Sequence, residues 1–283
     1  MKNNEQAKDA RPTTLVIGST GKTGRRIVRL LEDQGASVRQ GSRQADPRFD
    51  WDYPSEWPAA LHGVHAVYIS YYPDLAVPGA PEAIRQLTAC ARAAGVQRLV
   101  LLSGRGEANA QRCEQIVREC GIDYTLLRAS WFAQNFSEGH LHAPLQSGVL
   151  ALPAGDVCEP FVDVDDIAEV AVAALTDERH TGQLYEITGP RLMSFAEVTA
   201  EISRVAGRDI AYLPVTSEQF RTAVAEQDGP ELADMLTELC NEVLDGRNAM
   251  TGDGVQRALG REPRDFTDYC TAAAATGAWD LPA

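Results

Sequence analysis

A glycine-rich segment, GSTGKTG over residues 18–24, has residue types and spacing suited to holding a nucleotide. Its Gly-Lys-Thr occurs in the phosphate loops of nucleotide hydrolases, and its glycines at every third position occur in dinucleotide-binding turns. A phosphate loop needs a further glycine five residues before Gly21. That position is Val16, inside an apolar run, so the spacing favours a dinucleotide-binding turn.

In such a turn each glycine has a task. Gly18 makes the tight turn after a strand, Gly21 lets a pyrophosphate approach the start of a helix, and Gly24 lets helix and strand pack closely. We expect Lys22 to be a solvated residue of the first helical turn, near the phosphates. A glycine-rich turn without a ligand is the alternative. The cofactor contacts predicted here are Gly18, Thr20, Gly21, Lys22, Thr23 and Gly24.

The segment VRQGSRQ, residues 38–44, bears on which dinucleotide is bound. An NAD-binding protein usually has an acidic residue about 20 positions beyond the first glycine, which holds the ribose 2′-hydroxyl. This segment contains no acid. Ser42 and Arg43 instead suit a 2′-phosphate, because a guanidinium can donate two parallel hydrogen bonds to it. The sequence therefore predicts NADP(H), and the alternative is that Arg43 is an ordinary solvated loop residue.

The elements that must position these residues are strands and helices in alternation. Helical patterns alternate with apolar, β-rich runs at 13–18, 36–40, 66–70, 96–103 and 123–128. This rhythm predicts an α/β fold, a Rossmann-type doubly wound parallel sheet with right-handed crossovers. Beyond residue 194 the patterns are mostly helical, which predicts a small C-terminal lobe.

Three parts are expected along the chain. Residues 1–12 are polar and are predicted to form a flexible tail. Residues 13–155 are expected to form the NADP-binding domain. Residues 156–283 are expected to complete the sheet and to form the substrate lobe.

The composition excludes several classes of partner. A formal net charge of −14 and a pI near 4.8 leave no basic footprint for nucleic acid or for an anionic membrane surface. Six cysteines without a CxxC motif are typical of reduced thiols, and the N-terminus lacks the apolar stretch of a signal peptide. We therefore expect a cytoplasmic monomer or homodimer that acts on a small molecule.

Residues just beyond the expected strands are candidates for the site, because ligands of such sheets bind at the carboxyl ends of the strands. Ser70 ends one strand and Tyr71 and Tyr72 follow it, while Ser103 ends the central strand. We expect Ser70, Tyr71 and Ser103 to contact the cofactor, and Tyr72 and Ser103 to contact the reacting atoms. Exposed loop aromatics and a hydroxyl satisfied by the local backbone are the alternatives.

Longer segments resemble the NmrA-like group of atypical short-chain dehydrogenases, and within it the ergot alkaloid biosynthesis reductases of the festuclavine synthase and agroclavine dehydrogenase type. The resemblance runs from about residue 13 to 275. It rests on several segments taken together: GSTGKTGRRI, FDWDYPSEWPAAL, VYISYYPD, RLVLLSG, GIDYTLLRASWFAQNFSE, PFVDVDDIAEVAVAALTDE, YEITGPRLMSFAEVTAEIS and LPVTSEQF.

The resemblance implies an NADP-binding Rossmann domain with a small C-terminal substrate lobe. In the ergot enzymes hydride passes from NADPH to an iminium carbon, and the wider group also contains quinone reductases and cofactor-sensing regulators. It further implies that Asp50 and Trp51 lie at the cofactor. The segment after residue 128 faces nicotinamide and substrate in the family, or else forms an aromatic core under the lobe. The substrate contacts it implies are Tyr72, Trp131, Phe132, Asn135 and Phe136.

The usual proton donor of short-chain dehydrogenases, a Tyr-x-x-x-Lys pair, has no match in this chain. Lysine occurs only at positions 2, 8 and 22. Tyr124 and Arg128 have the spacing but lie on an expected strand, where they would be about 13 Å apart. A ketone needs a proton as it accepts hydride, whereas an iminium ion does not and a quinone needs less help. The sequence favours an NADPH-dependent reductase of iminium or imine-type acceptors, with a quinone reductase or a non-catalytic NADP-sensing regulator as alternatives.

Glu114 lies on the expected helix where the catalytic tyrosine would be. We expect it to stabilise an iminium charge, with Ser103 and Tyr72 as the other catalytic residues, and a solvated helical glutamate is the alternative. The acidic cluster at 163–166 has the form of a helix start, where Asp caps backbone amides, so no metal site is predicted there.

Overall fold

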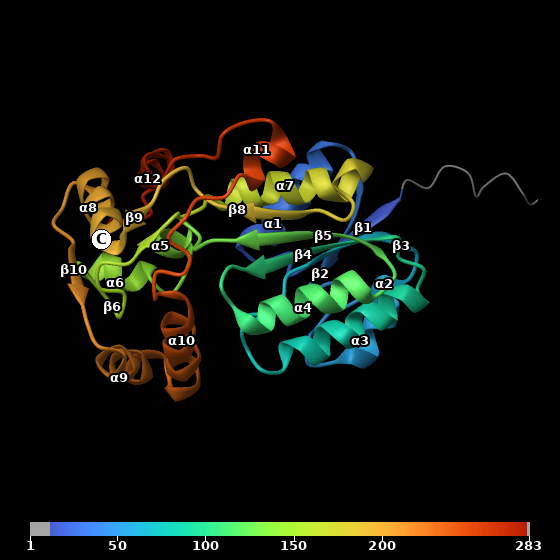
Figure 1. The fold of residues 1–283 in the computed structure, drawn as a ribbon, viewed down its shortest axis with the longest axis horizontal. Helices are drawn as coiled ribbons and strands as arrows, with labels where there is room; N and C mark the ends of the chain where they lie inside the picture. Colours follow the sequence, from blue (N-terminus) through green and yellow to red (C-terminus); the bar gives the residue numbers. More distant parts are fainter. Residues whose placement is uncertain (1–11, 282–283) are drawn as a thin grey trace, which may run out of the picture.

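The computed structural model of the chain describes residues 12–281. Its centre is a six-stranded parallel sheet with the strand order β2-β1-β3-β4-β5-β8 (Figure 1). The predicted Rossmann-type, doubly wound α/β fold is confirmed. The strands are β1 (Thr13–Ile17), β2 (Ser37–Gly41), β3 (Val64–Ile69), β4 (Arg98–Gly104), β5 (Asp123–Ala129) and β8 (Leu184–Ile187).

Helices cover both faces of the sheet (Figure 1). One face packs against α1 (Lys22–Asp33), α7 (Val164–Thr176) and α11 (Gly254–Leu259). The opposite face packs against α2 (Trp57–Leu61), α3 (Ala80–Ala93) and α4 (Ala108–Glu119). Two short 3₁₀ turns lie between these elements, η1 (Pro54–Glu56) and η2 (Glu178–His180).

The central strands read as largely apolar runs because helices cover both faces of the sheet there. Leu15, Val16 and Ile17 of β1 are fully buried. Leu15 and Ile17 belong to one hydrophobic core and Val16 to the core on the opposite face. This is the pattern that a parallel sheet covered by helices on both sides requires.

The order of the sheet reverses between β1 and β3, which pair directly with each other. Connections leave the two strands toward opposite faces at such a switch point, and the crevice between them is where ligands of doubly wound sheets bind. Gly18 follows β1, Ser70 follows β3, and Ser103 lies near the end of β4. The topology therefore brings the predicted cofactor residues to one edge of the sheet.

The remaining elements form a lobe beyond the carboxyl ends of the strands, on the left in Figure 1. It is mostly helical, as expected, but it also contains two small two-stranded sheets, β10-β6 and β7-β9. Its helices are α5 (Asn135–Glu138), α6 (His142–Ser147), α8 (Phe195–Ala206), α9 (Ser217–Asp228), α10 (Pro230–Val243) and α12 (Phe266–Ala275). Its strands are β6 (Val149–Leu152), β7 (Cys158–Glu159), β9 (Met193–Ser194) and β10 (Ala211–Pro214).

The core of the lobe is a cluster of aromatic rings. Phe161 packs against Phe195 with ring centroids 5.1 Å apart, and Phe136 packs against Phe266 at 5.8 Å. Phe136 and Leu150 precede residue 155, and Phe195 and Phe266 follow it. The lobe core therefore draws on both sides of the expected division at residue 155. Of the expected tail at 1–12, residues 1–11 lie outside the described residues.

The acidic cluster that the sequence placed at a helix start lies at the beginning of α7. The carboxylate of Asp163 accepts a hydrogen bond from the backbone N–H of Asp165 at 2.8 Å, so Asp163 caps the helix. Asp166 is fully buried and pairs with Arg261 at 2.6 Å and with Arg264. These ion pairs join α7 to the segment that follows α11. Within residues 12–281, no helix combines the length and the apolar character needed to cross a membrane.

Candidate active site

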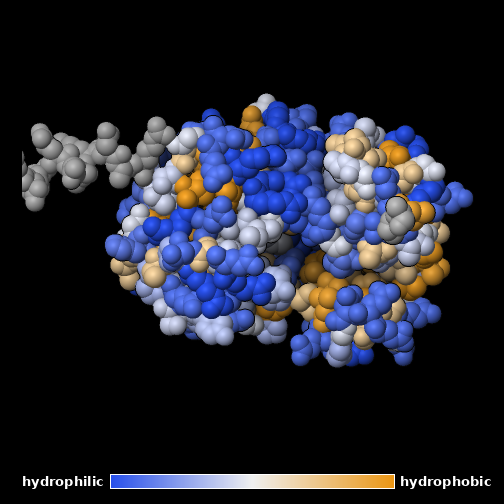
Figure 2. All heavy atoms as spheres, turned by 180° about the vertical axis from the view of Figure 1, so that it is seen from behind, coloured by the Kyte–Doolittle hydropathy of each residue, from blue (hydrophilic) through white to orange (hydrophobic). Residues whose placement is uncertain are grey.

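A cleft of about 790 Å³ lies where the carboxyl ends of β1, β3, β4 and β5 face the lobe. Figure 2 shows the surface hollowed at the boundary between the two parts, with apolar residues gathered on the lobe side. Gly24, Glu114 and Phe136 do not line this cleft. The predicted residues that line it are Gly18, Thr20, Gly21, Lys22, Thr23, Ser42, Arg43, Asp50, Trp51, Ser70, Tyr71, Tyr72, Ser103, Trp131, Phe132 and Asn135.

The glycine turn after β1 is tightly packed. Gly18 has a φ of 75°, in the left-handed region that favours glycine, and its N–H donates to Gly41 O at 2.9 Å. A Cβ on Gly24 would overlap the carbonyl oxygen of Gly18. Gly24 therefore lets α1 lie directly against the turn, which is the packing task that the spacing predicted, although it does not reach the cleft itself.

The start of α1 faces the cleft with its backbone amides. Gly21 precedes the helix in an extended conformation, and within the described part of the chain no side chain caps it. The first N–H groups of a helix have no partner inside the helix, and together with the helix dipole they favour an anion. This end of the cleft thus fits the pyrophosphate of a dinucleotide.

Lys22 differs from the expectation of a solvated side chain. It is half-buried, and its Nζ donates to Asn135 Oδ1 of the lobe at 3.0 Å. Burial lowers the pKa of Lys22. Asn135, predicted as a substrate contact, therefore lies where it holds the lysine of the cofactor turn and links α1 to α5.

The residues predicted to hold a 2′-phosphate lie at the end of β2. Ser42 and Arg43 both line the cleft, and Arg43 is exposed. Among residues 12–281 its guanidinium has no hydrogen bond or ion pair. The neighbouring cation, Arg48, is already paired. Its Nη2 donates to the carboxylate of the buried Asp50 at 2.6 Å. The cationic group that is available at this end of the cleft is therefore that of Arg43.

Aromatic side chains build the wall beside the end of β3. The Trp51 and Tyr71 rings meet edge to face with centroids 4.7 Å apart. Tyr72 is 70% exposed at the mouth of the cleft. Thr23 is buried, and its hydroxyl accepts from the Tyr68 hydroxyl at 2.9 Å, so this hydroxyl serves packing between α1 and β3.

Glu114 lies beneath the cleft rather than in it. It is 2% exposed and accepts a hydrogen bond from Ser103 Oγ at 2.7 Å. Arg128 of β5 donates to the same carboxylate from Nε at 2.9 Å. Glu114 is thus neither solvated nor free to face an iminium ion, because its charge is already paired with Arg128. Its place fits a role in holding Ser103, which does line the cleft.

The lobe contributes the opposite wall. Trp131 and Phe132 line the cleft, and Trp131 packs edge to face on Phe195 with centroids 5.6 Å apart. Phe136 is fully buried in the aromatic core of the lobe, which is the alternative that the sequence left open. Sequence reasoning missed the apolar face of α10. The sequence shows the helical spacing of its apolar residues, but not that this face lines the cleft. The residues of this face at the cleft are Leu232, Met235, Leu236, Leu239 and Val243.

Sequence reasoning also missed carboxyl groups in the cleft, among them those of Asp74 and Glu107. Asp74 follows the tyrosines after β3, and Glu107 immediately precedes α4. Their positions after strands were a signal, but their proximity depends on how two separate loops meet. The cleft thus joins an anion-binding, polar end at the glycine turn to an aromatic and apolar end that contains two acids.

A parallel sheet with a glycine turn at its switch point, opening into a cleft under a lobe, is the architecture of a dinucleotide-binding protein. Together with its relatives it places the chain among the NAD(P)-dependent oxidoreductases of the atypical short-chain dehydrogenase class. The sequence pattern of the NmrA-like family matches residues 52–270, and the chain belongs to this family. The class and the family both agree with the resemblance found in the sequence.

Individual relatives are similar over almost their whole length. The chain is 33% identical over 290 residues to an NAD(P)H azoreductase of Xenophilus azovorans, covering 93% of this chain and 99% of that protein. It is 30% identical over 283 residues to a festuclavine dehydrogenase of Aspergillus fumigatus, with 91% and 96% covered. The fold resembles an NADPH-dependent quinone oxidoreductase from Escherichia coli in complex with NADPH, with a TM-score of 0.74, 22% identity, and 92% and 99% covered. The azoreductase is named for NAD(P)H and the quinone oxidoreductase for NADPH, in agreement with the predicted cofactor, NADP(H).

Proposed function

We propose that the chain is an NADPH-dependent reductase of an iminium or imine-type acceptor in specialised, alkaloid-like metabolism. The proposal rests on the side chains at the aromatic and apolar end of the cleft, which we call the acceptor end. Its walls are aromatic and apolar, and the polar groups between them include the carboxyls of Asp74 and Glu107. Such a pocket favours a flat, apolar molecule that bears a basic nitrogen.

The lack of a Tyr–Lys pair supports the same acceptor class. Tyr124 and Arg128 both lie on β5, and Lys22 is hydrogen-bonded to Asn135. A ketone would become an alkoxide, and short-chain dehydrogenases supply its proton from that pair. An iminium ion becomes a neutral amine, so the chain needs only to hold it in place.

The chain's residues then have a division of tasks. Bound NADPH supplies the hydride. The glycine turn, the start of α1 and Arg43 hold its phosphates, while Tyr71, Tyr72 and Trp131 fix the plane of the acceptor. Catalysis on this proposal is mostly positioning, in a cleft whose lobe side excludes water. As part of the same proposal, the working unit is a cytoplasmic monomer or homodimer.

A matched pair of acceptors tests the proposal. NADPH consumption is followed with N-methyl-3,4-dihydroisoquinolinium, a cationic iminium, and with α-tetralone, a ketone on a similar ring system. We expect turnover of the iminium and none of the ketone. Turnover of the ketone alone, or of neither compound, would contradict the proposal.

Two other outcomes would identify the alternatives. Turnover of menadione without turnover of the iminium would assign the chain as a quinone reductase. Tight NADP(H) binding without turnover of any acceptor would assign it as a regulator that senses the cofactor.

A further inference from the structure

Two acidic side chains from different loops meet at the acceptor end of the cleft. Glu107 precedes α4, and its carboxyl lies over Gly104, where a Cβ would overlap it. Asp74 lies in the loop after β3, and its carboxylate accepts from the N–H of Ala76 at 2.8 Å. Asn109 of α4 donates to Ala76 O at 2.7 Å, which ties the two loops together. The pair is therefore held by both the β3 and the β4 connections.

Among residues 12–281, one oxygen of the buried Glu107 carboxyl has no hydrogen-bond partner. Glu107 is 9% exposed, yet it lines the cleft. The unpartnered atom is Oε2. A buried polar atom without a partner is costly, and in a native structure it often marks a place for a ligand or a proton transfer.

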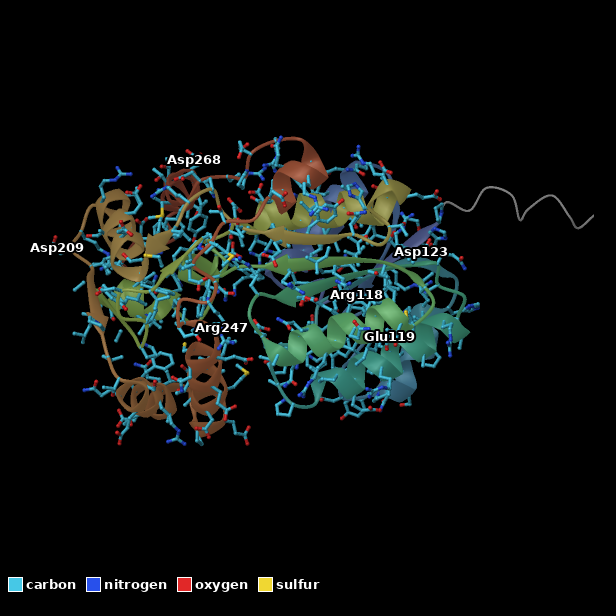
Figure 3. The ribbon with its side chains drawn as sticks, viewed as in Figure 1. Arg118, Glu119, Asp123, Asp209, Arg247 and Asp268 are labelled. Carbon is cyan, nitrogen blue, oxygen red and sulfur yellow. The ribbon has the colours of Figure 1, made fainter. Side chains whose placement is uncertain are left out.

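The surroundings of Glu107 favour its protonated form. Burial and the charges of Asp74 and Glu242 raise the pKa of Glu107 well above its usual range, with a smaller contribution from Glu114. Glu242 of α10 accepts from the N–H of Ala108 at 2.8 Å. Arg247, labelled in Figure 3, donates to Gly106 O at 3.0 Å, and its charge is paired with Asp245. Burial likewise raises the pKa of Asp74, and two acids that interact this closely favour sharing a proton.

The opposite wall of the cleft is apolar. Leu236 and Val243 of α10 are buried and Leu239 is half-buried, and all three line the cleft with the two acids. An acid that faces an apolar wall gives its proton to a bound base more readily than to bulk water, because little water competes there.

We propose that Glu107, hydrogen-bonded to Asp74, is the proton donor of this cleft, and that it protonates the nitrogen of a neutral imine to form the iminium ion that accepts hydride. The inference rests on the proposed function and says how its neutral imine acceptors become iminium ions. The nitrogen gains the proton of the Glu107 O–H, and the carbon gains two electrons and a hydrogen as hydride from the reduced nicotinamide, which is oxidised. The neutral amine leaves, and the Glu107 carboxylate takes a proton from solvent through the mouth of the cleft.

A pair of acceptors with and without the need for a proton tests this role. One is a 3,4-dihydroisoquinoline with an electron-withdrawing substituent, which is neutral at pH 7.5, and the other is the N-methyl iminium salt of the same compound. Glu107→Gln should lower turnover of the imine about 10²- to 10⁴-fold. Turnover of the salt should fall far less, because the salt needs no proton and the negative charge of Asp74 remains to hold it. Glu119→Gln, at the exposed far end of α4 (Figure 3), is the control and should change neither.

A second variant changes the pKa of Glu107 without replacing Glu107 itself. Asp74→Asn removes a charge that raises the pKa of Glu107. Turnover of the imine requires protonated Glu107 and falls as pH rises through its pKa, so in this variant the fall should occur at lower pH. The carboxylic acid band in infrared difference spectra, present in the parent and absent in Glu107→Gln at pH 7.5, checks the proton directly.

The outcomes separate this inference from the proposed function. Equal losses with imine and salt in Glu107→Gln, or an unmoved pH profile in Asp74→Asn, would overturn the proton donor. If the parent enzyme reduces the salt but not the imine, the inference is wrong and the proposed function stands. If it reduces neither, both are wrong.

Discussion

Ser103 shows how a single hydroxyl can be committed before any ligand arrives. It lines the cleft, and it donates to Glu114, whose charge Arg128 already balances. The hydroxyl hydrogen therefore points away from the ligand, and the oxygen lone pairs are left to accept from the ligand. The sequence predicted that Glu114 stabilises an iminium charge. Its contacts instead fit a residue that positions Ser103.

Arg43 is the residue on which the choice of cofactor rests. Arg43→Ala should weaken NADPH binding about 10- to 100-fold, because charge-assisted hydrogen bonds to a 2′-phosphate would be lost. NADH binding should not change. Nicotinamide fluorescence titrations with both cofactors measure the two affinities. Arg92→Ala, an exposed arginine of α3, serves as the control, and equal losses for NADPH and NADH would place Arg43 outside the phosphate site.

At the scale of elements, the close packing of α1 against the glycine turn shapes the end of the cleft that is predicted to bind the cofactor. α1 touches the turn at Gly24, touches β3 through Thr23 and Tyr68, and touches the lobe through Lys22. A shift of this helix would therefore move its amide end and the lysine together.

Gly24→Ala should produce such a shift. The added methyl group would overlap Gly18 O, and relief of that overlap costs about 1–3 kcal/mol of unfolding free energy. We expect a lower melting temperature and weaker NADPH binding together. Gly79→Ala is the matched control, because a Cβ at the start of α3 meets nothing within 4 Å. If both variants behave alike, the close packing of α1 is not needed for the site.

The elements also show what sequence reasoning can reach. The turn, β1 and the place of Arg43 beside the cleft were predictable because strand, turn and helix start are local in the chain. The face of α10 and the pair formed by Asp74 and Glu107 were not, because each depends on loops that meet only in the fold. Phe136 and Trp131 looked alike in the sequence, and only packing separates the core residue from the one that lines the cleft.

At the scale of the whole molecule, one buried acid couples stability to pH. Glu159 is fully buried, and neither of its carboxyl oxygens has a partner among residues 12–281. Burial raises the pKa of Glu159 from 4.5 to about 7. The folded state therefore holds this proton more tightly than the unfolded chain does. The resulting stability is fully present below pH 4.5 and is lost as pH rises to about 7.

Glu159→Gln should remove this loss. At pH 8 the variant should be more stable than the parent, by on the order of 3 kcal/mol, and at pH 4.5 the two should be close. Urea unfolding at both pH values measures the difference. Glu262→Gln, an exposed glutamate, is the control. If the difference in unfolding free energy between parent and variant is the same at pH 4.5 and at pH 8, ionisation of Glu159 does not destabilise the fold.

The interleaving of the two cores limits how the acceptor end of this protein can be altered. The chain leaves the sheet after β5, returns for α7 and β8, enters the lobe again at β9, returns for α11 and enters the lobe a third time at α12. The lobe therefore cannot be exchanged between relatives as one block cut at a single point. The segment from α9 through α10 is continuous and carries the apolar face of the cleft, so it is the unit that a chimaera can transplant to change which acceptor is reduced.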